Sequence, residues 1–258
     1  MFEQLSEREE RILGSLAENP RLGVNDLAKI HGVSDVTIRS ILNGLEDKAF
    51  FVRSHGGGFP AFHPAMLARI KNHSELKLKL AMRAADFIAP GMSVMLVGGT
   101  TTSFIPRFLL GKSEIKIVTN STLLLPYARI NPRIDFIFTG GDFRPEIEEM
   151  VGPIAIRELR QFHVDAVFTG IDGYTEPDGL TADTTEIAEI VQTMVAQSDR
   201  TVIVTDSSKF MRKGFARMMP LKKVDLVITD GNIPQKIAKT IEKAKVELIQ
   251  VPWSDKRR

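Results

Sequence analysis

The 258-residue sequence contains no cysteine, which excludes a disulfide framework and any metal site built on thiolates. It also lacks an apolar run near the roughly 20 residues that a membrane-spanning helix needs. The opening segment 1–10 is charged, so we expect no signal segment, no membrane partner and a cytoplasmic location. Neither sign of charge is in large excess, and a formal net charge of +2 by itself indicates no polyanionic partner. The length and the 43% apolar content suffice for one large or two smaller domains.

The N-terminal part of the chain has the pattern of a helix-turn-helix. Ser6 followed by Glu9 is a capping-box pattern that predicts the start of a first helix. In the segment 22–58, Gly32 suits a left-handed turn, and Ser34 stands where the next helix needs an N-cap. Apolar residues at helical spacing are expected to face inward: Ile12, Leu13, Leu16, Val24, Leu27, Ala28, Ile38, Ile41, Leu42 and Leu45.

The outer face of the predicted second helix of this motif is suited to DNA. Short polar side chains and one arginine on a helix held by its back can reach base edges in a major groove. The segment 50–53 is typical of a strand and 55–58 of a turn, which together predict a wing. The residues that we expect to contact DNA are Ser34, Thr37, Arg39, Ser40, Asn43 and His55. A three-helix packing module with a solvated face is the alternative, and the local charge favours it, since residues 1–60 carry seven Lys/Arg and nine Asp/Glu.

From residue 74 onward, short apolar runs alternate with helical patterns. This alternation predicts an open α/β domain with a mostly parallel sheet that helices cover on both faces. The predicted strands are 94–97, 115–119, 135–139, 166–170, 202–206, 225–229 and 247–251. We therefore expect a winged helix-turn-helix domain at 1–60, a linker at 61–73 that leads into a helix, and an effector-binding and oligomerisation domain at 74–252.

Polar residues follow most of these strands, and the carboxyl ends of parallel strands share one edge of a sheet. The loop 98–103 offers glycines, hydroxyls and a helix N-terminus, which fits a phosphate, although an ordinary strand-to-helix turn is the alternative. Two carboxylates and a lysine nearby suit the hydroxyls and charge of a phosphorylated polyhydroxy compound. The expected ligand-binding residues are Gly99, Thr100, Thr101, Thr102, Ser103, Asn120, Ser121, Gly141, Asp172, Glu186 and Lys209. The histidines lack metal-ligand spacing, so we expect neither a metal site nor a cofactor.

Both halves of the chain carry short motifs in a fixed order. They are Leu27-Ala28, Val33-Ser34, Thr37-Ile38-Arg39, Leu45-Glu46, Arg53-Ser54-His55-Gly56-Gly57, Gly99-Thr100-Thr101, Thr119-Asn120-Ser121, Gly140-Gly141, Gly170-Ile171-Asp172-Gly173, Gly179-Leu180-Thr181, Asp206-Ser207-Ser208-Lys209 and Ile228-Thr229-Asp230. In these motifs the chain resembles the DeoR family of bacterial transcriptional regulators. The resemblance implies an effector domain related in fold to ribose-5-phosphate isomerase and similar sugar-phosphate enzymes. It also implies a phosphorylated sugar as the effector and, in most members, repression of a carbohydrate operon. The segment 206–220 is most similar to regulators of sugar-alcohol and amino-sugar use, such as galactitol.

Two positions depart from the family pattern. The family usually continues Thr-Ile-Arg with a second arginine, where this chain has Ser40, so one cation toward DNA is missing. Many members carry an aspartate where this chain has Val97, so a sugar-hydroxyl contact is lost or moved.

Two other functions fit parts of the sequence. In a sugar-phosphate isomerase, Asp172 or Glu186 would transfer the proton and Lys209 would stabilise the enediolate. In a simpler DNA-binding protein, the larger domain would only oligomerise. The segment 22–58 favours a regulator over an enzyme, and paired operator half-sites favour a homo-oligomer, a dimer or a tetramer, joined through the larger domain.

Overall fold

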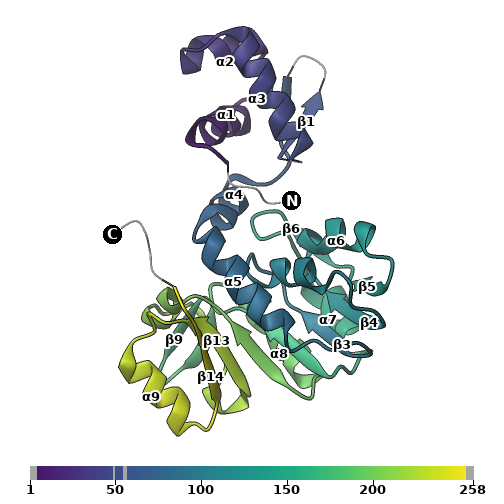
Figure 1. The fold of residues 1–258 in the computed structure, drawn as a ribbon, viewed down its shortest axis with the longest axis vertical. Coiled ribbons are helices and arrows are strands. Elements are labelled where there is room, and N and C mark those ends of the chain that lie inside the picture. Colours follow the sequence, from purple (N-terminus) through teal and green to yellow (C-terminus); the bar gives the residue numbers. More distant parts are fainter. Residues whose placement is uncertain (1–4, 49, 55–56, 254–258) are drawn as a thin grey trace. The chain divides into compact units, whose positions relative to one another are not determined.

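The computed structural model describes residues 5–48, 50–54 and 57–253 (Figure 1). The chain forms two compact units. Unit 1 comprises Met1–Ser74 with Pro145–Ile147, and unit 2 comprises Glu75–Arg144 with Glu148–Arg258. No helix in the described part of the chain is both long enough and apolar enough to cross a bilayer.

Unit 1 is built from helices and one hairpin. Its elements are α1 (Glu7–Glu18), α2 (Val24–His31), α3 (Asp35–Asp47), β1 (Phe51–Ser54), β2 (Gly57–Pro60) and α4 (Pro64–Lys71). The antiparallel β1–β2 pair follows α3 directly and forms the predicted wing. Helix α4 lies within the stretch 61–73, which the sequence analysis treats as a linker leading into a helix. The predicted His55 lies outside the described residues.

Local signals in unit 1 act as predicted. The Ser6 hydroxyl accepts the Glu9 amide at 3.3 Å, and the Ser6 amide donates to the Glu9 carboxylate at 2.7 Å, which completes the capping box. Gly32 ends α2 with φ 64° and ψ 38°, the left-handed conformation that glycine adopts at little cost. Of the ten apolar residues expected to face inward, all except Val24 and Ile41 are buried, and these two are half-buried.

Unit 2 contains a seven-stranded sheet whose neighbouring strands all pair in parallel. The strand order is β14-β13-β11-β8-β3-β4-β5. These strands are β3 (Ser93–Leu96), β4 (Ile115–Thr119), β5 (Ile134–Phe138), β8 (Ala166–Thr169), β11 (Thr201–Val204), β13 (Leu226–Asp230) and β14 (Glu247–Val251). All seven predicted strands are therefore confirmed, and so is the predicted fold class.

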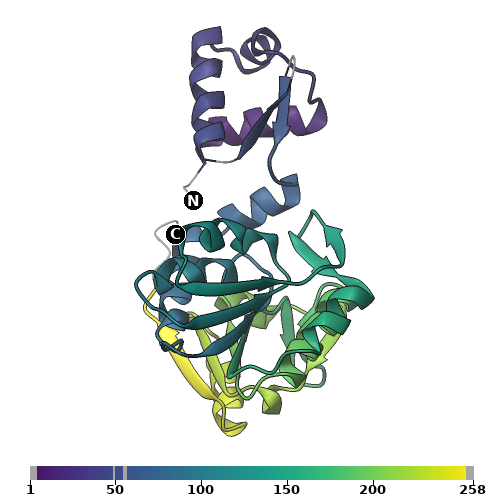
Figure 2. The same cartoon turned by 90° about the vertical axis from the view of Figure 1, so that its right-hand side faces the viewer.

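The order of strands reverses between β3 and β8, because β4 and β5 extend the sheet in one direction and β11, β13 and β14 in the other. Helices lie on both faces of the sheet (Figure 2). The helices of unit 2 are α5 (Ser74–Ala85), η1 (Thr102–Leu109), η2 (Thr122–Leu124), α6 (Leu125–Ile130), α7 (Gly152–Leu159), α8 (Thr185–Ala196), η3 (Ser207–Met211), η4 (Leu221–Lys223) and α9 (Gln235–Lys243), where η marks a 3₁₀ helix. In such sheets, ligands bind beyond the carboxyl ends of the strands at the reversal.

Two small antiparallel sheets were not predicted. One pairs β6 (Asp142–Arg144) with β7 (Glu149–Val151), and the other orders β12 (Ala216–Met219), β10 (Gly179–Ala182) and β9 (Gly173–Thr175). Their strands are only three or four residues long, which is too short for a clear period of two. Both sheets contact loops that follow strands of the large sheet: Asn120 donates to Glu149 of β7, and the Asp172 amide donates to the Thr181 carbonyl of β10.

Candidate functional site

Helix α3 presents the expected outer face. Its inner positions Ile38, Leu42 and Leu45 are buried, whereas Arg39 and Ser40 are exposed. The Arg39 guanidinium forms no ion pair with any described residue, so its donors remain available to a partner. The helix therefore offers one uncompensated cation and one hydroxyl on the face that we predict to read DNA.

Ser34 and Thr37, also predicted to contact DNA, are bonded to each other. The Ser34 hydroxyl lies 2.8 Å from the Thr37 hydroxyl and accepts the Thr37 amide at 3.2 Å. The bond from the Thr37 amide caps the first turn of α3. Ser34 therefore fixes the start of the helix.

Replacing Ser34 with alanine is expected to lower the free energy of unfolding of unit 1 by about 1 kcal/mol, the usual cost of losing an N-cap. Ser34→Asn keeps a capping oxygen and is the matched control, expected to stay close to wild type. Chemical denaturation followed by circular dichroism measures both variants. Equal destabilisation by alanine and asparagine would contradict the capping role.

Asn43 is held by the wing. The guanidinium of Arg53, on β1, donates through Nε to Glu46 Oε2 at 2.7 Å and through a second nitrogen to Asn43 Oδ1. This link was not predicted from the sequence, because α3 and β1 are separate elements and contacts between their side chains leave no periodic pattern in the sequence. The link fixes the amide of Asn43 against the helix while leaving the residue exposed.

In unit 2, the loop after β3 lies at the reversal of strand order. Gly99 has φ 135°, and Thr100 and Thr101 are about nine-tenths buried. Among the described residues, no acceptor is bonded to the backbone N–H groups of Gly99, Thr100 and Thr101. Three consecutive amides without acceptors at the start of η1 form a place where an anion can be held.

The hydroxyls of this loop do a different task from the one expected. Thr102 Oγ1 donates to the carbonyl oxygens of Val97 at 2.7 Å and Gly99 at 3.0 Å, and Ser103 Oγ donates to Gly99 at 2.6 Å. Both side chains are about 1% exposed. They fix the shape of the loop, and their hydroxyl hydrogens are engaged by its carbonyl oxygens.

Asn120 connects this loop to the hairpin β6–β7. Its Oδ1 accepts the Gly98 amide at 3.0 Å, and its Nδ2 donates to Glu149 Oε2 at 3.0 Å. The Glu149 carboxyl group is buried and occupies the space that a β-carbon on Gly98 would need. A side chain at position 98 would therefore have to displace the Glu149 carboxyl group, which accepts a hydrogen bond from Asn120.

Ser121 and Glu148 form a second link between the loop after β4 and the hairpin β6–β7. The Ser121 hydroxyl donates to the Glu148 carbonyl at 3.2 Å, and the Thr122 hydroxyl donates to the Glu148 carboxylate. Burial raises the pKa of Glu148, and the bond from Thr122 opposes that shift. Ser121 thus holds the hairpin in place through backbone contacts.

The loop after β8 gathers charges. Lys209 Nζ lies 3.6 Å from Asp172 Oδ1, and Asp172 Oδ2 accepts the Asp183 amide at 3.0 Å. Asp183 in turn pairs with Arg212 at 3.2 Å. The structure therefore brings the predicted Asp172 and Lys209 together and adds two partners that the sequence analysis missed.

Two further predicted ligand residues are Glu186 and Gly141, and among the residues that the structure describes neither is hydrogen-bonded to Asp172 or Lys209. Glu186, in the first turn of α8, pairs with Arg144 at 2.6 Å. Gly141 lies between β5 and β6, beside Gly140, whose amide donates to Glu158 at 2.7 Å. Arg144 and Arg212 lie in or next to the short strands of the small sheets, which explains why the sequence did not single them out.

Comparison with known families assigns the chain. Residues 8–58 match the model described as the DeoR-like helix-turn-helix domain. Residues 72–231, more than half of the chain, match the model described as the DeoR C terminal sensor domain. The chain belongs to the DeoR family. It is a transcriptional regulator rather than an enzyme, which settles the choice between the regulator and the isomerase.

Individual relatives of this DeoR-family chain match over both units. An Escherichia coli protein named for transcriptional repression of the aga operon is 31% identical over 252 residues, which cover 95% of this chain and 94% of that protein. The glycerol-3-phosphate regulon repressor of Haemophilus influenzae is 27% identical over 245 residues, covering 94% and 95%. Among solved structures, ribose 5-phosphate isomerase A of Methanocaldococcus jannaschii matches 53% of this chain and 54% of that chain at 20% identity, with a TM-score of 0.39.

Proposed function

We propose that this DeoR-family regulator controls a carbohydrate operon, and that a phosphorylated sugar bound to unit 2 sets its affinity for operator DNA. The observation that carries the effector half is the run of three amides without acceptors at Gly99, Thr100 and Thr101. This run follows β3 at the reversal of strand order, where ligands bind in open α/β sheets. A phosphate accepts several such hydrogen bonds at once, which a neutral hydroxyl does not.

The rest of the edge suits the sugar. Strand β8 is the hydrogen-bonded neighbour of β3, and the loop that follows β8 carries Asp172. The Asp172 carboxylate can accept hydrogen bonds from sugar hydroxyls, and Lys209 supplies a positive charge beside it. The Glu186–Arg144 pair at the start of α8 adds a second carboxylate and a second cation. The two cations would attract the phosphate of a phosphorylated sugar, and the two carboxylates would accept hydrogen bonds from its hydroxyls.

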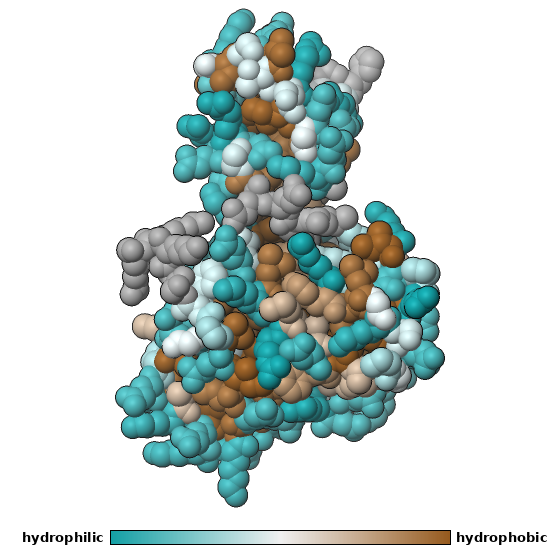
Figure 3. Space-filling view, in the orientation of Figure 1, coloured by the Kyte–Doolittle hydropathy of each residue, from teal (hydrophilic) through white to brown (hydrophobic). Residues whose placement is uncertain are grey.

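The DNA half of the proposal rests on α3 and the wing. One winged module makes few contacts, so tight binding needs paired modules on half-sites about one helical turn or its multiples apart. We place the pairing in unit 2, where large apolar side chains are exposed (Figure 3). These side chains are Met82, Leu110, Leu125, Ile130, Ile137, Phe143, Ile154, Met211 and Phe215. A regulator that acts on chromosomal operators works in the cytoplasm.

The names of the two relatives support the proposed class of effector and the proposed type of operon. One is named for the aga operon and the other for the glycerol-3-phosphate regulon, both of which are terms of carbohydrate or polyol use. Repression is the direction of control in both names. We extend both features to this chain as part of the proposal.

Isothermal titration calorimetry with matched pairs of sugar phosphates and free sugars tests the effector half. The free sugar is expected to bind about 10- to 150-fold more weakly than its phosphate, because charged hydrogen bonds of about 1.5–3 kcal/mol are lost. Operator affinity, measured with and without each phosphate, shows whether binding is coupled to DNA. Tighter binding of free sugars would refute the anion site at 99–101.

A further inference from the structure

Ion pairs in unit 1 determine which of its charges stay uncompensated. Residues 1–60 carry a net charge of −2, which is unusual for a DNA-binding domain. Within unit 1, however, Glu9 pairs with Lys48 at 3.0 Å, Glu10 with Lys71 at 2.7 Å, and Glu46 with Arg53 at 2.7 Å. These three carboxylates are neutralised locally. The charges that remain uncompensated are therefore distributed differently from the charges in the sequence.

Arg8 and Arg11 are two of the uncompensated cations. They lie three residues apart on α1 and both are exposed, with Arg8 one helical turn before the buried Ile12. Within the residues that the structure describes, neither guanidinium forms an ion pair. Residues three apart on a helix are neighbours, so the two positive charges reinforce each other.

Both arginines line a hollow that α1 shares with the recognition helix. The residues of α3 in this hollow include Val36, Thr37 and Ser40, which belong to the half of α3 nearer its N-terminus. Glu7 and Glu9 also line it, but Glu9 is already paired with Lys48. The two guanidinium groups thus flank the face of α3 that we predict to enter the major groove.

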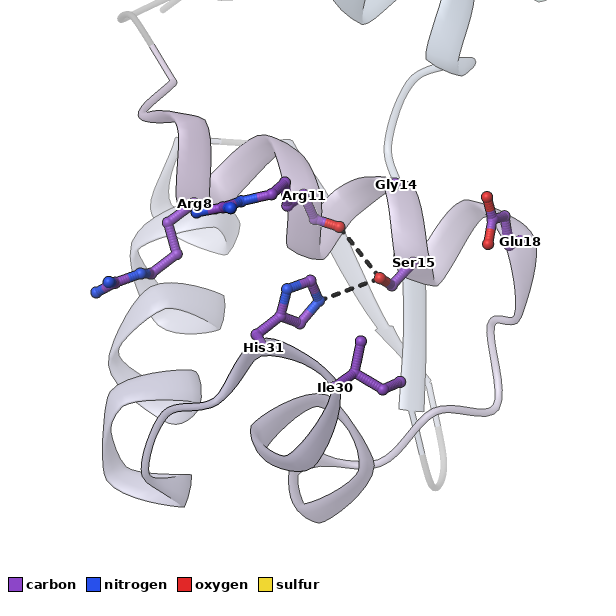
Figure 4. A pocket seen from close by; sticks show the side chains of 7 residues that line it. All are labelled: Arg8, Arg11, Gly14, Ser15, Glu18, Ile30 and His31. Carbon is purple, nitrogen blue, oxygen red and sulfur yellow. Dashed lines mark hydrogen bonds between the residues drawn. The ribbon is translucent and has the colours of Figure 1, made fainter.

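A second hollow places the same arginines beside the end of α2. It is lined by Arg8, Arg11, Gly14, Ser15, Glu18, Ile30 and His31 (Figure 4). His31 Nε2 lies 3.1 Å from the Ser15 hydroxyl, which joins α2 to α1 at the floor of the hollow. Burial and the charge of Arg11 lower the pKa of His31, so its ring is neutral near pH 7 and does not add a charge. The charged side chains that line this hollow are therefore the two arginines and Glu18.

We propose that Arg8 and Arg11 bind backbone phosphates of the operator, at the edge of the groove that α3 enters. A recognition helix fills a major groove about 12 Å wide, so the elements beside it meet the phosphates of the groove edge. Phosphate contacts set the position and orientation of a protein on DNA without reading sequence. Arginines on α1 would supply this contact where α3 itself carries only Arg39. The inference rests on the proposed DNA reading by α3.

Salt dependence of DNA binding is the measurement that isolates phosphate contacts. We would compare wild type with Arg8→Gln, Arg11→Gln and the double variant, using the DNA upstream of the protein's own gene and a random duplex of about 30 base pairs. Each lost phosphate contact is expected to reduce the slope of log K against log salt by about 0.9, and to weaken binding about tenfold near 0.1 M salt. The loss should be the same on both DNAs.

Matched variants separate a local effect from a general one. Lys239→Gln, an exposed position on α9 in unit 2, removes the same charge and is expected to leave the slope unchanged. Arg8→Lys and Arg11→Lys keep the charge and should retain the wild-type slope, which excludes misfolding as the cause.

The outcomes also distinguish a failure of the α1 phosphate contacts from a failure of DNA binding by unit 1. Slopes of the glutamine variants equal to that of wild type would overturn the role of α1, while wild-type binding to the upstream DNA left the DNA reading intact. Absence of salt-dependent binding in wild type itself would instead refute the DNA reading by unit 1.

Discussion

Replacing Lys209 with alanine is expected to shift the effector response to much higher effector concentrations while leaving operator affinity in the absence of effector unchanged. Its ammonium group lies 3.6 Å from the Asp172 carboxylate, and its side chain is only 25% exposed. A charged hydrogen bond in such a setting contributes about 1.5–3 kcal/mol, so the effector should bind about 10- to 150-fold more weakly. An effector shifts DNA affinity only through its different affinities for two states of the protein, so the dose–response should move by the same factor.

Effector titrations of the protein–DNA complex, read by fluorescence anisotropy, measure this shift. Lys213→Ala is the matched control, because Lys213 is 66% exposed and pairs with Asp178 rather than Asp172. We expect this control to respond like wild type. An unchanged midpoint for Lys209→Ala would remove Lys209 from the effector site.

Arg39→Ala is expected to weaken operator binding by about 1–3 kcal/mol, or roughly 5- to 150-fold, if the guanidinium reads a base. Arg39 is exposed on α3 and forms no ion pair with the described residues, so little stability should be lost with it. Because base contacts carry sequence information, binding to random DNA should fall much less. This pattern is the opposite of the one expected for Arg8 and Arg11.

Footprinting on the upstream DNA and competition with random duplex measure the Arg39 effect. Arg39→Lys keeps the charge but cannot make a two-pronged contact with guanine, so it should recover binding to random DNA more than binding to operator. Identical footprints for wild type and Arg39→Ala would show that base reading lies elsewhere on α3 or the wing.

The sequence predicted the large sheet well for a physical reason. Strands such as β8 and β11 are short apolar runs buried between helices, and polar or glycine-rich loops bound them on both sides. The cap of α3 at Ser34 and the left-handed turn at Gly32 were also predictable, because each follows from the chemistry of one residue. These features depend on local sequence and need no knowledge of distant contacts.

The site was predictable only in part, because side-chain pairing depends on elements that are far apart in the chain. Ser34 and Thr37 have the right chemistry for DNA, yet their hydroxyls bond each other. Thr102 and Ser103 likewise bond carbonyls of their own loop. Arg212 reaches Asp183 across 29 positions, and no periodic pattern marks such a contact. The sequence motifs therefore indicated the correct loops, whereas the structure was needed to show which hydrogen-bond donors are already engaged within the protein.

The contact between Glu149 and Gly98 links two positions on separate elements into one unit of sequence change. Because the Glu149 carboxyl group fills the place of a β-carbon on Gly98, alanine at 98 meets a clash as long as glutamate remains at 149. The two substitutions should therefore be strongly non-additive. A lineage that shortens residue 149 first can then accept a side chain at 98, whereas the reverse order passes through a strained intermediate. A single buried carboxylate thus favours one order of mutations in the loop 98–103 over the other.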